Sequence, residues 1–428
     1  MAAGGDTPAS SGLTGFICVD AQTTKAASPD TRPAPAGLIA LLMAMTAIGP
    51  LSLNILVPAV PGLAVIFNSK VETVQLTLSL YLVGLAVSQL VLGPLSDRFG
   101  RKPVLLIGLF ITAVTSAAAV FSTSVEMLIT LRTLQALGAS SGLVIGRAII
   151  RDLYDRDRAA AMIGLVTTVM VIAPMVAPLL GGVLDTALGW EWTFIVVAFF
   201  AAVVFVWTFF ALAETRPDHI TGGGVRFMWN ESRELLSDMR FVGYVLVCAL
   251  GTATFFAFLG GGPHLIIGIM ARTSAEYGVW FILTSFGFMG GNFLAARLSQ
   301  RYGIDNMVRL GMTFLVLGAI VSIVLAALWP DGGPWIVFVP QFLISLGNGI
   351  FLPNTIAGAV SVRPQAAGTA SGITGFFQMA TGALAAQAMS HVVATSTSAM
   401  PLAIAMLVLS GAATIAMLIF LPRRARRT

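Results

Sequence analysis

The chain has 428 residues, of which 57% are hydrophobic and 10% are charged, with a formal net charge of +5 and a mean hydropathy of +0.90. A soluble domain carries about a quarter of its residues as charges, so this composition excludes a water-soluble globular enzyme and indicates a chain embedded in lipid. Two cysteines are too few for a disulfide framework or a four-cysteine metal site, and we expect neither a metal nor a cofactor.

The first 36 residues are polar and contain four prolines. They lack the basic start and short apolar stretch of a signal peptide, and they predict a disordered cytoplasmic tail. Beyond them, apolar stretches long enough to cross about 30 Å of hydrocarbon recur along the chain. They predict an all-α membrane protein with twelve transmembrane helices, at residues 37–58, 72–95, 103–121, 125–148, 158–185, 190–213, 240–262, 275–298, 307–329, 333–356, 367–391 and 399–421.

Lysine and arginine residues fall almost entirely between alternate spans. With a cytoplasmic N-terminus, 21 of the 24 lie on the cytoplasmic side, including those of a basic tail at residues 422–428, whereas Lys70 and Arg272 lie outside and Arg132 lies within a span. Cytoplasmic loops carry such an excess of positive charge, so both termini are predicted to be cytoplasmic, in the inner membrane of a bacterium. The basic residues would face the anionic leaflet of the lipid bilayer, and we expect no nucleic acid as a partner.

The longest internal polar segment, residues 214–239, is predicted to be a cytoplasmic linker that contains a short amphipathic helix. It separates six spans in residues 37–213 from six in residues 240–421. At an offset of 203 residues, Pro94–Gly100 and Arg297–Gly303 are identical at four of seven positions. This repeat predicts two pseudo-symmetric six-helix bundles around a central cavity, which is the plan of alternating-access carriers.

The loop at residues 93–103, with the sequence GPLSDRFGRKP, joins the second and third spans. It resembles the signature loop of the major facilitator superfamily and matches it at every defined position. The resemblance implies the fold of that superfamily and a conformational latch, in which the aspartate holds span 11 while the cavity opens outward. The implied latch residues are Gly93, Asp97, Arg98, Gly100 and Arg101. A solvated basic loop without this role is the alternative.

The fourth span contains Leu131–Ser140, which resembles a further superfamily element, R-x-x-Q-G-x-G-A, with Ala136 in place of a glycine. Arg132 and Gln135 fall on one face of the predicted helix. A charge in hydrocarbon costs about 2.5–3.5 kcal/mol on insertion scales unless it faces protein or water, so we expect Arg132 and Gln135 to face the central cavity. The alternative is that Arg132 extends to the nearby outer membrane surface.

The fifth span contains Ala173–Gly182, which resembles the antiporter element G-P-x-x-G-G with Ala177 in place of its first glycine. Prolines kink a helix and small residues let it pack closely, so this span is expected to seal one route through the cavity. The residues concerned are Pro174, Pro178, Gly181 and Gly182. The resemblance implies export, and a helix bent only for packing is the alternative.

Further segments resemble the Bcr/CflA group of drug:proton antiporters, to which phenicol exporters are close. They are Val74–Tyr81, Gln89–Pro94 and Arg147–Tyr154. The resemblance implies an aspartate in the first span that binds a proton or a cationic drug. Asn54 stands at that position, and an asparagine cannot titrate. Because the acidic residues of the other spans lie only at their edges, the location of a proton site stays open at this point.

The charge of the cavity also limits which substrates it can bind. A cavity that contains Arg132 and no carboxylate would repel cations and accept neutral or anionic molecules. The predicted substrate-binding residues are Tyr81, Gln89, Phe255, Phe256, Phe258, Asn348, Phe377 and Gln378, with Asn54 as a further polar group. We therefore predict a monomeric secondary active transporter that exports small neutral or anionic amphipathic compounds, such as drugs and antibiotics, by alternating access in exchange for protons. The alternative is an uncoupled or differently coupled metabolite carrier of the same fold.

The sequence disfavours an enzyme that acts within the membrane. The three histidines, His219, His264 and His391, are scattered along the chain, and the H-E-x-x-H zinc motif does not occur. We expect a transporter that binds a small-molecule substrate.

Overall fold

The structure is a computed structural model of the chain. It describes residues 36–154, 169–215 and 225–421, together with residues 159, 162, 163, 165 and 166. The predicted N-terminal tail up to residue 35, the C-terminal tail at 422–428 and most of the residues between 155 and 168 lie outside the described residues. The described residues belong to one compact unit.

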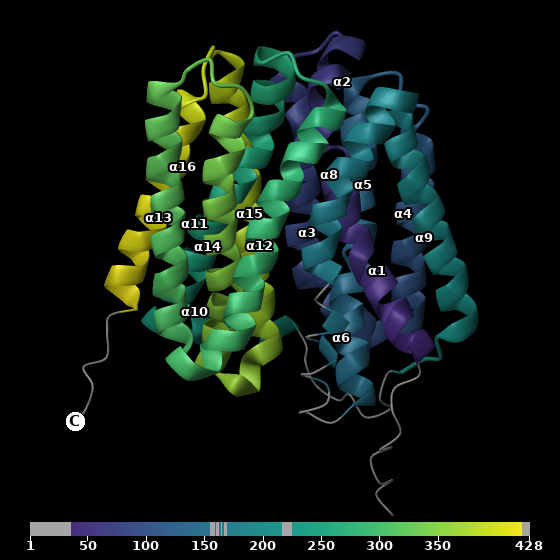
Figure 1. Ribbon diagram of the computed structural model, residues 1–428. Helices are drawn as coiled ribbons and strands as arrows, with labels where there is room; N and C mark the ends of the chain where they lie inside the picture. Colours follow the sequence, from purple (N-terminus) through teal and green to yellow (C-terminus); the bar gives the residue numbers. More distant parts are fainter. Residues whose placement is uncertain are drawn as a thin grey trace, which may run out of the picture. The chain divides into compact units, whose positions relative to one another are not determined.

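Within these ranges the chain consists of helices and short connections (Figure 1). The helices are α1 (Ala36–Ile55), α2 (Val60–Ile66), α3 (Val71–Phe99), α4 (Arg101–Ala119), α5 (Val125–Ala139), α6 (Ser141–Leu153), α8 (Val169–Leu188), α9 (Glu191–Ala211), α10 (Val225–Ser237), α11 (Met239–Pro263), α12 (Ser274–Tyr302), α13 (Ile304–Leu328), α14 (Trp335–Val362), α15 (Ala367–Ala394) and α16 (Met400–Phe420). Three short helical segments join them: η1 (Val57–Ala59) before α2, η2 (His264–Ile269) after α11 and η3 (Pro364–Ala366) before α15.

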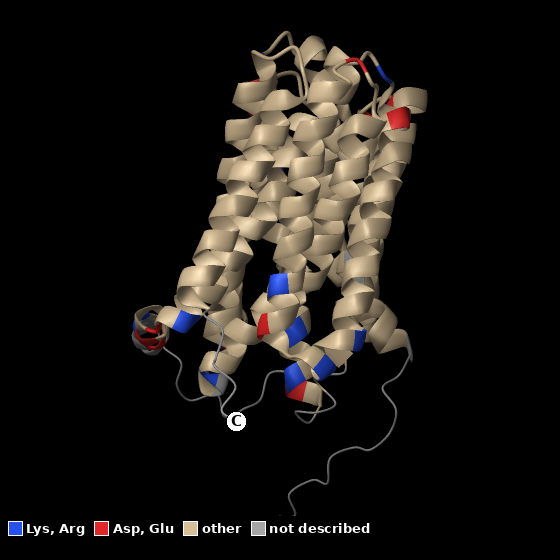
Figure 2. Cartoon of the chain, turned by 60° about the vertical axis from the view of Figure 1, so that its left-hand side comes forward, with Lys and Arg blue, Asp and Glu red and all other residues tan. Residues whose placement is uncertain are grey.

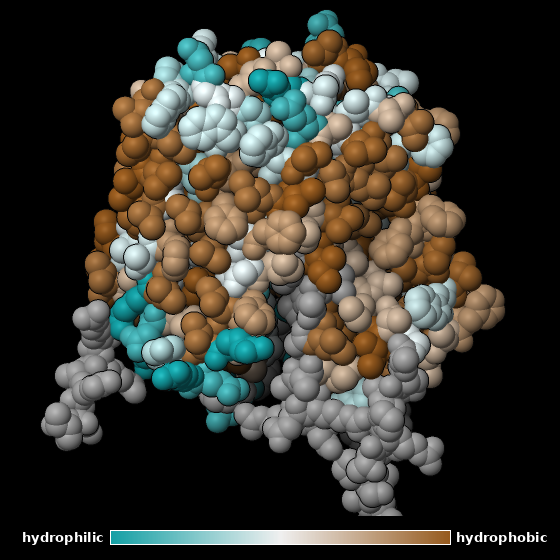
Figure 3. Space-filling model, in the orientation of Figure 1, coloured by the Kyte–Doolittle hydropathy of each residue, from teal (hydrophilic) through white to brown (hydrophobic). Residues whose placement is uncertain are grey.

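Ten described segments are long and apolar enough to cross a membrane. They are α1 with α2, α3, α4, α5 with α6, α9, α11 with η2, α12, α13, α14 and α16. The other two predicted spans correspond to α8, whose described part is apolar, and to α15, which is long enough but rich in Gly, Ala, Ser and Thr. Hydrophobic side chains cover most of the middle of the molecule (Figure 3). The protein is therefore an all-α, multi-pass membrane protein, as its hydropathy predicts.

Several observed spans run beyond their predicted bounds, for example to Val362 instead of residue 356 in α14, and two spans differ in the course of the helix itself. The first span does not stop at residue 58, because the helical path continues through η1 and α2 to Ile66, with a proline in the first turn of each segment. The fourth span consists of two helices, α5 and α6, which meet at Ser140 and end at Leu153 instead of residue 148. The amphipathic helix of the linker is present as α10.

The helix positions reproduce the repeat found in the sequence. Helices α3 and α12 are each 29 residues long and begin 203 residues apart, at Val71 and Ser274. Each ends at a glycine with a positive φ, 104° at Gly100 and 80° at Gly303, and the next helix starts directly after it. A residue with a side chain would be strained at these angles, so the two glycines fix the same turn in both places.

The helices form two groups with extensive internal packing (Figure 1). In the first group, α1 packs on α6, α8 and α9, and α4 packs on α5 and α9. In the second group, α14 packs on α11, α12 and α13, and α11 packs on α15 and α16. The groups meet mainly where α3 lies along α15 and where α8 lies along α12. We refer to α1–α9 as the first half and to α10–α16 as the second half.

Positive charges gather at one end of the helices (Figure 2). This end is called the basic end. It is where α3, α6, α12 and α14 end and where α4, α11 and α13 begin, and these helix ends carry Arg98, Arg101, Lys102, Arg151, Arg240, Arg301, Arg309 and Arg363. The opposite end, where α3 and α12 begin, carries Lys70 and Arg272. The fold therefore sorts these residues between the two ends as the sequence pattern predicts.

Candidate binding cavity

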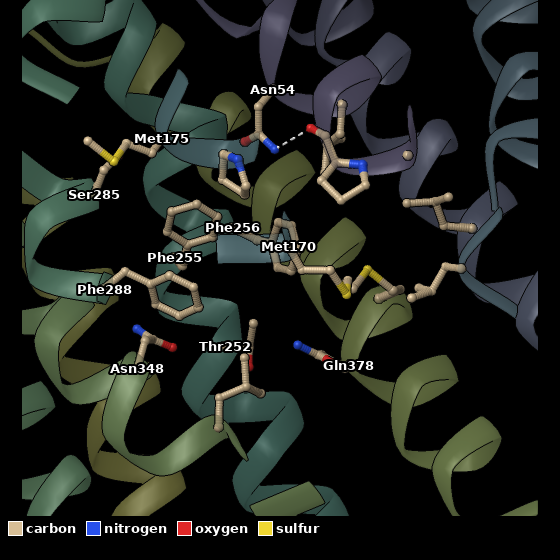
Figure 4. A pocket seen from close by; sticks show the side chains of 18 of the residues that line it. Asn54, Met170, Met175, Thr252, Phe255, Phe256, Ser285, Phe288, Asn348 and Gln378 are labelled. Carbon is tan, nitrogen blue, oxygen red and sulfur yellow. Dashed lines mark hydrogen bonds between the residues drawn. The ribbon is translucent and has the colours of Figure 1, made fainter. Parts of the chain in front are cut away.

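A cavity lies between the two halves, near the middle of the helices (Figure 4). Its apolar lining includes Met170, Met175, Phe255, Phe256, Phe281 and Phe288, and its polar lining consists of Asn54, Gln89, Ser140, Thr252, Thr284, Ser285, Asn348 and Gln378. None of the described residues that line it has a charged side chain. The cavity therefore suits an uncharged, largely apolar ligand with a few hydrogen-bonding groups.

Two asparagines, one from each half, are the most deeply buried amide groups of the lining. Asn54 of α1 is 2% exposed, and its side-chain nitrogen donates to the backbone carbonyl of Pro50 at 2.8 Å. Asn348 of α14 is 3% exposed, and its side-chain nitrogen donates to the backbone carbonyl of Ile344 at 3.1 Å. The side-chain oxygens of both asparagines have no hydrogen-bond partner among the described residues.

Several residues predicted from the sequence to bind substrate meet at this cavity. They are Asn54, Gln89, Phe255, Phe256, Asn348 and Gln378, and Pro174 of the predicted antiporter helix lies with them. These residues come from α1, α3, α8, α11, α14 and α15, so it is the packing of the two halves that brings them together. Their contact with a substrate stays a prediction.

Arg132 lies elsewhere, contrary to the expectation that it faces the cavity. It is 1% exposed inside the first half. Its Nη1 donates to the backbone carbonyl of Ser52 at 2.9 Å and to the side-chain oxygen of Gln135. The guanidinium carbon lies 4.2 Å from the centre of the Tyr81 ring. The guanidinium thus lies against a carbonyl, an amide and an aromatic face within the protein, whereas its Nε and Nη2 have no hydrogen-bond partner among the described residues.

Gln135 and Tyr81 are part of the same buried network. The side-chain nitrogen of Gln135 donates to Ser116 Oγ at 2.6 Å. The Tyr81 ring is fully buried beneath Arg132, and its hydroxyl donates to the Gly49 carbonyl at 3.1 Å. Neither side chain belongs to the described lining of the cavity, and both contact Arg132 inside the first half.

Phe258 and Phe377 are also absent from the described lining. Phe258 is fully buried in an aromatic cluster of the second half, with ring centres 6.4, 6.0 and 5.6 Å from those of Tyr277, Phe281 and Phe338. Phe377 is 39% exposed on α15. Aromatic residues at helical spacing fill helix interfaces as readily as they line cavities, and the sequence alone does not separate these two uses.

The loop at residues 93–103 forms a compact polar cluster at the basic end. Arg101 is 5% exposed. Its guanidinium forms ion pairs with Asp97 and, at 2.9 Å, with Asp152, and it donates to Ser96 Oγ at 2.7 Å. Three acceptors from α3 and α6 therefore hold one buried cation in place.

The backbone of this loop is held by Glu214, which follows α9. The Glu214 carboxylate accepts from the backbone N–H of Arg101 at 2.9 Å and from that of Lys102 at 3.2 Å. Gly100 leaves room for this contact, because a Cβ added there would lie 2.7 Å from a carboxylate oxygen of Glu214. The start of α4 thus receives a negative charge where its dipole is positive.

Hydrogen bonds join the two halves at the opposite end. The side chain of Gln387 in α15 accepts from Ser79 Oγ at 2.9 Å and donates to the backbone carbonyl of Glu72 at 2.9 Å. Ser274 Oγ at the start of α12 donates to the Pro58 carbonyl of η1 at 3.1 Å. These bonds link α3 to α15 and η1 to α12 beyond the cavity.

A family model described as the Major Facilitator Superfamily matches residues 42–386. The chain belongs to this superfamily. A chloramphenicol resistance protein of Pseudomonas aeruginosa is 30% identical over 335 residues, which cover 78% of this chain and 76% of that protein. A bicyclomycin resistance protein homolog of Haemophilus influenzae is 27% identical over 343 residues, which cover 78% of this chain and 84% of that protein.

A crystal structure of the human organic anion transporter MFSD10 (TETRAN) matches with a TM-score of 0.65 at 17% identity, covering 91% of this chain and all of that one. At this identity the likeness shows the fold alone. The predicted major facilitator fold is confirmed, as is the resemblance to the branch that includes bicyclomycin and chloramphenicol resistance proteins. The chain is thus a membrane transporter and not an enzyme.

The predicted antiporter element lies in α8, where its glycines bring three helices together. A Cβ at Gly181 would overlap the backbone carbonyl of Ile55 in α1, and one at Gly182 would overlap that of Ser274 in α12. Pro178 lies at a similar contact, since a Cβ added at Gly278 of α12 would lie 2.7 Å from the Pro178 carbonyl oxygen. This part of α8 therefore packs backbone to backbone against both halves.

The predicted latch residues all lie at the basic end, and they differ in their contacts. Asp97 is paired with Arg101 inside the first half. Gly93 has open space where a side chain would be, and the guanidinium carbon of Arg98 lies 5.2 Å from the centre of the Phe99 ring. The role of these residues as a latch stays a prediction.

Asp152 and Glu214 are candidates that the sequence reading did not assign to any site. Asp152 lies in a segment noticed only for its family resemblance, and Glu214 lies at the first position of the predicted linker. A loop with Arg98, Arg101 and Lys102 but a single acid indicates that carboxylates from elsewhere must pair with it. That imbalance is the signal by which the two residues could have been found.

Proposed function

We propose that this chain is a secondary active exporter of small, neutral, amphipathic compounds that works by alternating access between its two halves. The observation that carries the proposal is the cavity between the halves, which is mostly apolar and lined by uncharged polar groups. Burying an unpaired charge is costly, so a lining without ions favours neutral ligands. Because Arg132 lies away from the cavity, the reason to expect anionic substrates no longer applies.

The contacts between the halves support alternating access. If the basic end faces the cytoplasm, as the positive-inside rule predicts, the hydrogen bonds of Gln387 and Ser274 close the cavity toward the outside. Asp97 is paired with Arg101 within the first half. When the halves rock, Asp97 would leave Arg101 and contact α15 instead. We therefore assign the conformation to an inward-facing state in a bacterial inner membrane, with both termini in the cytoplasm.

Proton exchange is part of the proposal because of the resemblance to drug:proton antiporters. The position at which that group has an aspartate holds Asn54 here, and the described lining contains no carboxylate. This uncharged lining favours a second candidate, an uncoupled carrier that only equilibrates its substrate. The two candidates differ in whether movement of the substrate also moves protons.

Proteoliposomes that contain the purified protein separate the two candidates. Chloramphenicol is a suitable probe, because it is neutral and gives its name to one relative. Under an imposed pH gradient, a proton-exchanging exporter accumulates radiolabelled chloramphenicol, and without the gradient chloramphenicol changes the internal pH. An uncoupled carrier equilibrates the probe without a pH change. Uptake no faster than in protein-free liposomes, for chloramphenicol and for a panel of neutral amphipathic drugs, would refute the proposal.

A pair of glycine variants provides the control. A side chain at Gly182 would overlap the backbone of Ser274, so Gly182→Val is expected to keep the halves from closing at the opposite end and to abolish transport. Gly62, in α2, has open space where a side chain would be, and Gly62→Val is expected to transport like the unmodified protein.

A further inference from the structure

Two histidines of the second half meet a glutamate of the first half at the end opposite the basic end. Glu72 lies in the first turn of α3, His391 in the last turn of α15 and His264 at the start of η2. Glu72 Oε1 is 3.7 Å from His391 Nδ1, and the charge of Glu72 also acts on the His264 imidazole. The function proposed above uses none of these three side chains.

The hydrogen bonds between the halves lie next to this group. Gln387, one helical turn before His391, donates to the Glu72 carbonyl at 2.9 Å and accepts from Ser79. Beside it, η2 packs on α2 of the first half as well as on α15. The three titratable side chains therefore lie where the halves must part if the opposite end opens.

The backbone around His264 fixes the place of this side chain. The six residues of η2 form a π-helix, a rare conformation that is frequent at functional sites. Ala271, just beyond it, has a φ of 52°, which a residue with a Cβ adopts only where its surroundings impose it. A Cβ added at Gly268 would lie 3.1 Å from His264 Nδ1, so the imidazole packs on its own segment. The fold of η2 thus holds His264 next to the first half.

Solvent reaches the three groups to different extents. The His391 side chain is 76% exposed, so protons of the adjoining solution have access to it. The Glu72 side chain is 23% exposed, so its charge is less screened than that of a fully exposed carboxylate. A histidine changes its charge between pH 5 and 8, where a glutamate ordinarily stays ionised. Protonation of the histidines therefore turns a neutral contact into an attraction between opposite charges.

Other titratable groups near this contact do not change charge in the same pH range. The residues concerned, on α3, α15, η2 and the segments packed on them at this end, are Lys70, Glu126, Arg272, Glu276 and Tyr277. Arg272 and Glu276 lie 3.9 Å apart and pair with each other. Lysine, arginine, glutamate and tyrosine ordinarily keep one charge state between pH 5 and 8. Among the described residues of these segments, the two histidines are therefore the groups that respond to pH.

We propose that Glu72, His264 and His391 form a pH-sensitive contact that holds the halves together at this end in acid and weakens in alkali; it goes beyond the proposed function and rests on the rocking of the halves stated there. The carboxylate attracts an imidazolium but not a neutral imidazole. Closing this end therefore takes up protons. The closed arrangement is favoured below the range in which histidine titrates, and it loses this support above that range.

The contact acts on the conformational equilibrium and not on the substrate. None of the three side chains belongs to the described lining of the cavity, so a proton bound here does not have to cross the membrane. With the basic end in the cytoplasm, acid outside the cell favours the inward-facing state of the exporter. A less acid outer solution leaves the outward-facing state more populated. The contact thus makes the state of the transporter depend on the pH of the outer solution.

The test measures the separation of the halves at this end. Spin labels are attached to Ala187→Cys in the last turn of α8 and Ala327→Cys in the last turn of α13, both exposed positions, in the full-length protein with Cys18 and Cys248 replaced by alanine. Pulsed electron–electron double resonance in lipid nanodiscs gives the populations of short and long distances. An exposed ion pair shifts an equilibrium by about two- to fivefold, so two of them predict a ratio of closed to open protein about 4- to 25-fold higher at pH 5 than at pH 8.

Variants then assign this shift to the three groups. Glu72→Gln removes the shared negative charge and is expected to abolish the pH dependence. His264→Gln and His391→Gln are each expected to remove part of it, whereas His391→Lys keeps a positive charge and is expected to favour the closed arrangement at pH 8 as well. Glu126→Gln removes an exposed acid of the first half at the same end. It is the matched control and is expected to keep the full pH dependence.

The outcomes separate this contact from the proposed function. An equal ratio at pH 5 and pH 8, or a pH dependence that Glu72→Gln retains, overturns the contact; if chloramphenicol still changes the distance, the rocking of the halves stands. A distance that responds to neither pH, chloramphenicol nor the neutral panel overturns the rocking and the contact with it. Should Glu72→Gln fail to fold, the exposed position 391 decides, because an unaltered pH dependence in both His391→Gln and His391→Lys also overturns the contact.

Discussion

The loops that end α3 and α12 have the same backbone and different charges. Both follow a helix of 29 residues and turn at a glycine with a positive φ. At the offset of 203 residues, Asp97 corresponds to Gln300 and Arg101 to Ile304. The second loop therefore lacks both partners of the ion pair that lies within the first.

The second half has an ion pair nearby, but it lies closer to solvent. Arg240 and Asp305 are 3.0 Å apart, with 39% and 29% of their side chains exposed, and Tyr244 donates to the same carboxylate. In the first half the corresponding values are 6% for Arg101 and 11% for Asp152. The glycine turn is present in both halves. Among the described residues, a buried charge cluster lies only next to the turn of the first half. The comparison predicts that substitutions in the two halves will have unequal effects.

The largest expected effect is at Arg101. Arg101→Ala leaves Asp152 buried without its cation, and breaking a buried pair in this way costs about 3–5 kcal/mol of folding free energy. Arg301→Ala in the second loop removes an exposed cation next to Tyr302 and is expected to cost less than about 0.5 kcal/mol. Thermal unfolding of the purified variants in detergent measures both. Similar losses of melting temperature would show that the two loops are equally dependent on charge.

The glycines of the two turns are expected to come next. Alanine is strained at both positive φ values, by about 1–3 kcal/mol. Gly100→Ala also brings its Cβ to 2.7 Å from Glu214, whereas Gly303 has open space at that position. The melting temperature should therefore fall further for Gly100→Ala than for Gly303→Ala. The reverse order would mean that Glu214 does not hold the first turn.

A smaller effect than at the glycines is expected at the second half's own ion pair. Asp305→Asn removes a charge from a half-exposed pair, which is worth about 1 kcal/mol or less, and it keeps an acceptor for Tyr244. The melting temperature is expected to fall only slightly, and less in 0.5 M salt than in 0.05 M salt, because salt screens exposed charges. A loss as large as that of Arg101→Ala would contradict the contrast between the halves.

The fold could be predicted because its determinants are local. A run of apolar residues long enough to cross a bilayer reveals a span wherever it occurs, and the repeat of Pro94–Gly100 at Arg297–Gly303 already gave the offset at which the helices recur. The break at Ser140 was missed, because the apolar pattern continues across it and only the backbone shows that α5 ends there.

The cavity was harder to predict, because the direction of a side chain depends on the rotation of its helix. Asn54 and Asn348 line it as expected. Arg132 does not, because its charge is received by the Ser52 carbonyl and the Tyr81 ring. Every residue has a backbone carbonyl, so the pattern of side chains does not reveal which carbonyl of another helix is the acceptor. The sequence could therefore show that Arg132 needs a polar partner but not which one.

The linker helix α10 is attached to the second half. Glu234 pairs with Arg363 at the end of α14, and the hydroxyl of Thr369 in α15 donates to Glu231 at 2.8 Å. If the halves rock as proposed, this helix therefore moves together with the second half. A fluorophore on the exposed position Arg233, installed as Arg233→Cys, and a second dye on the first half would register each turnover as a change in energy transfer.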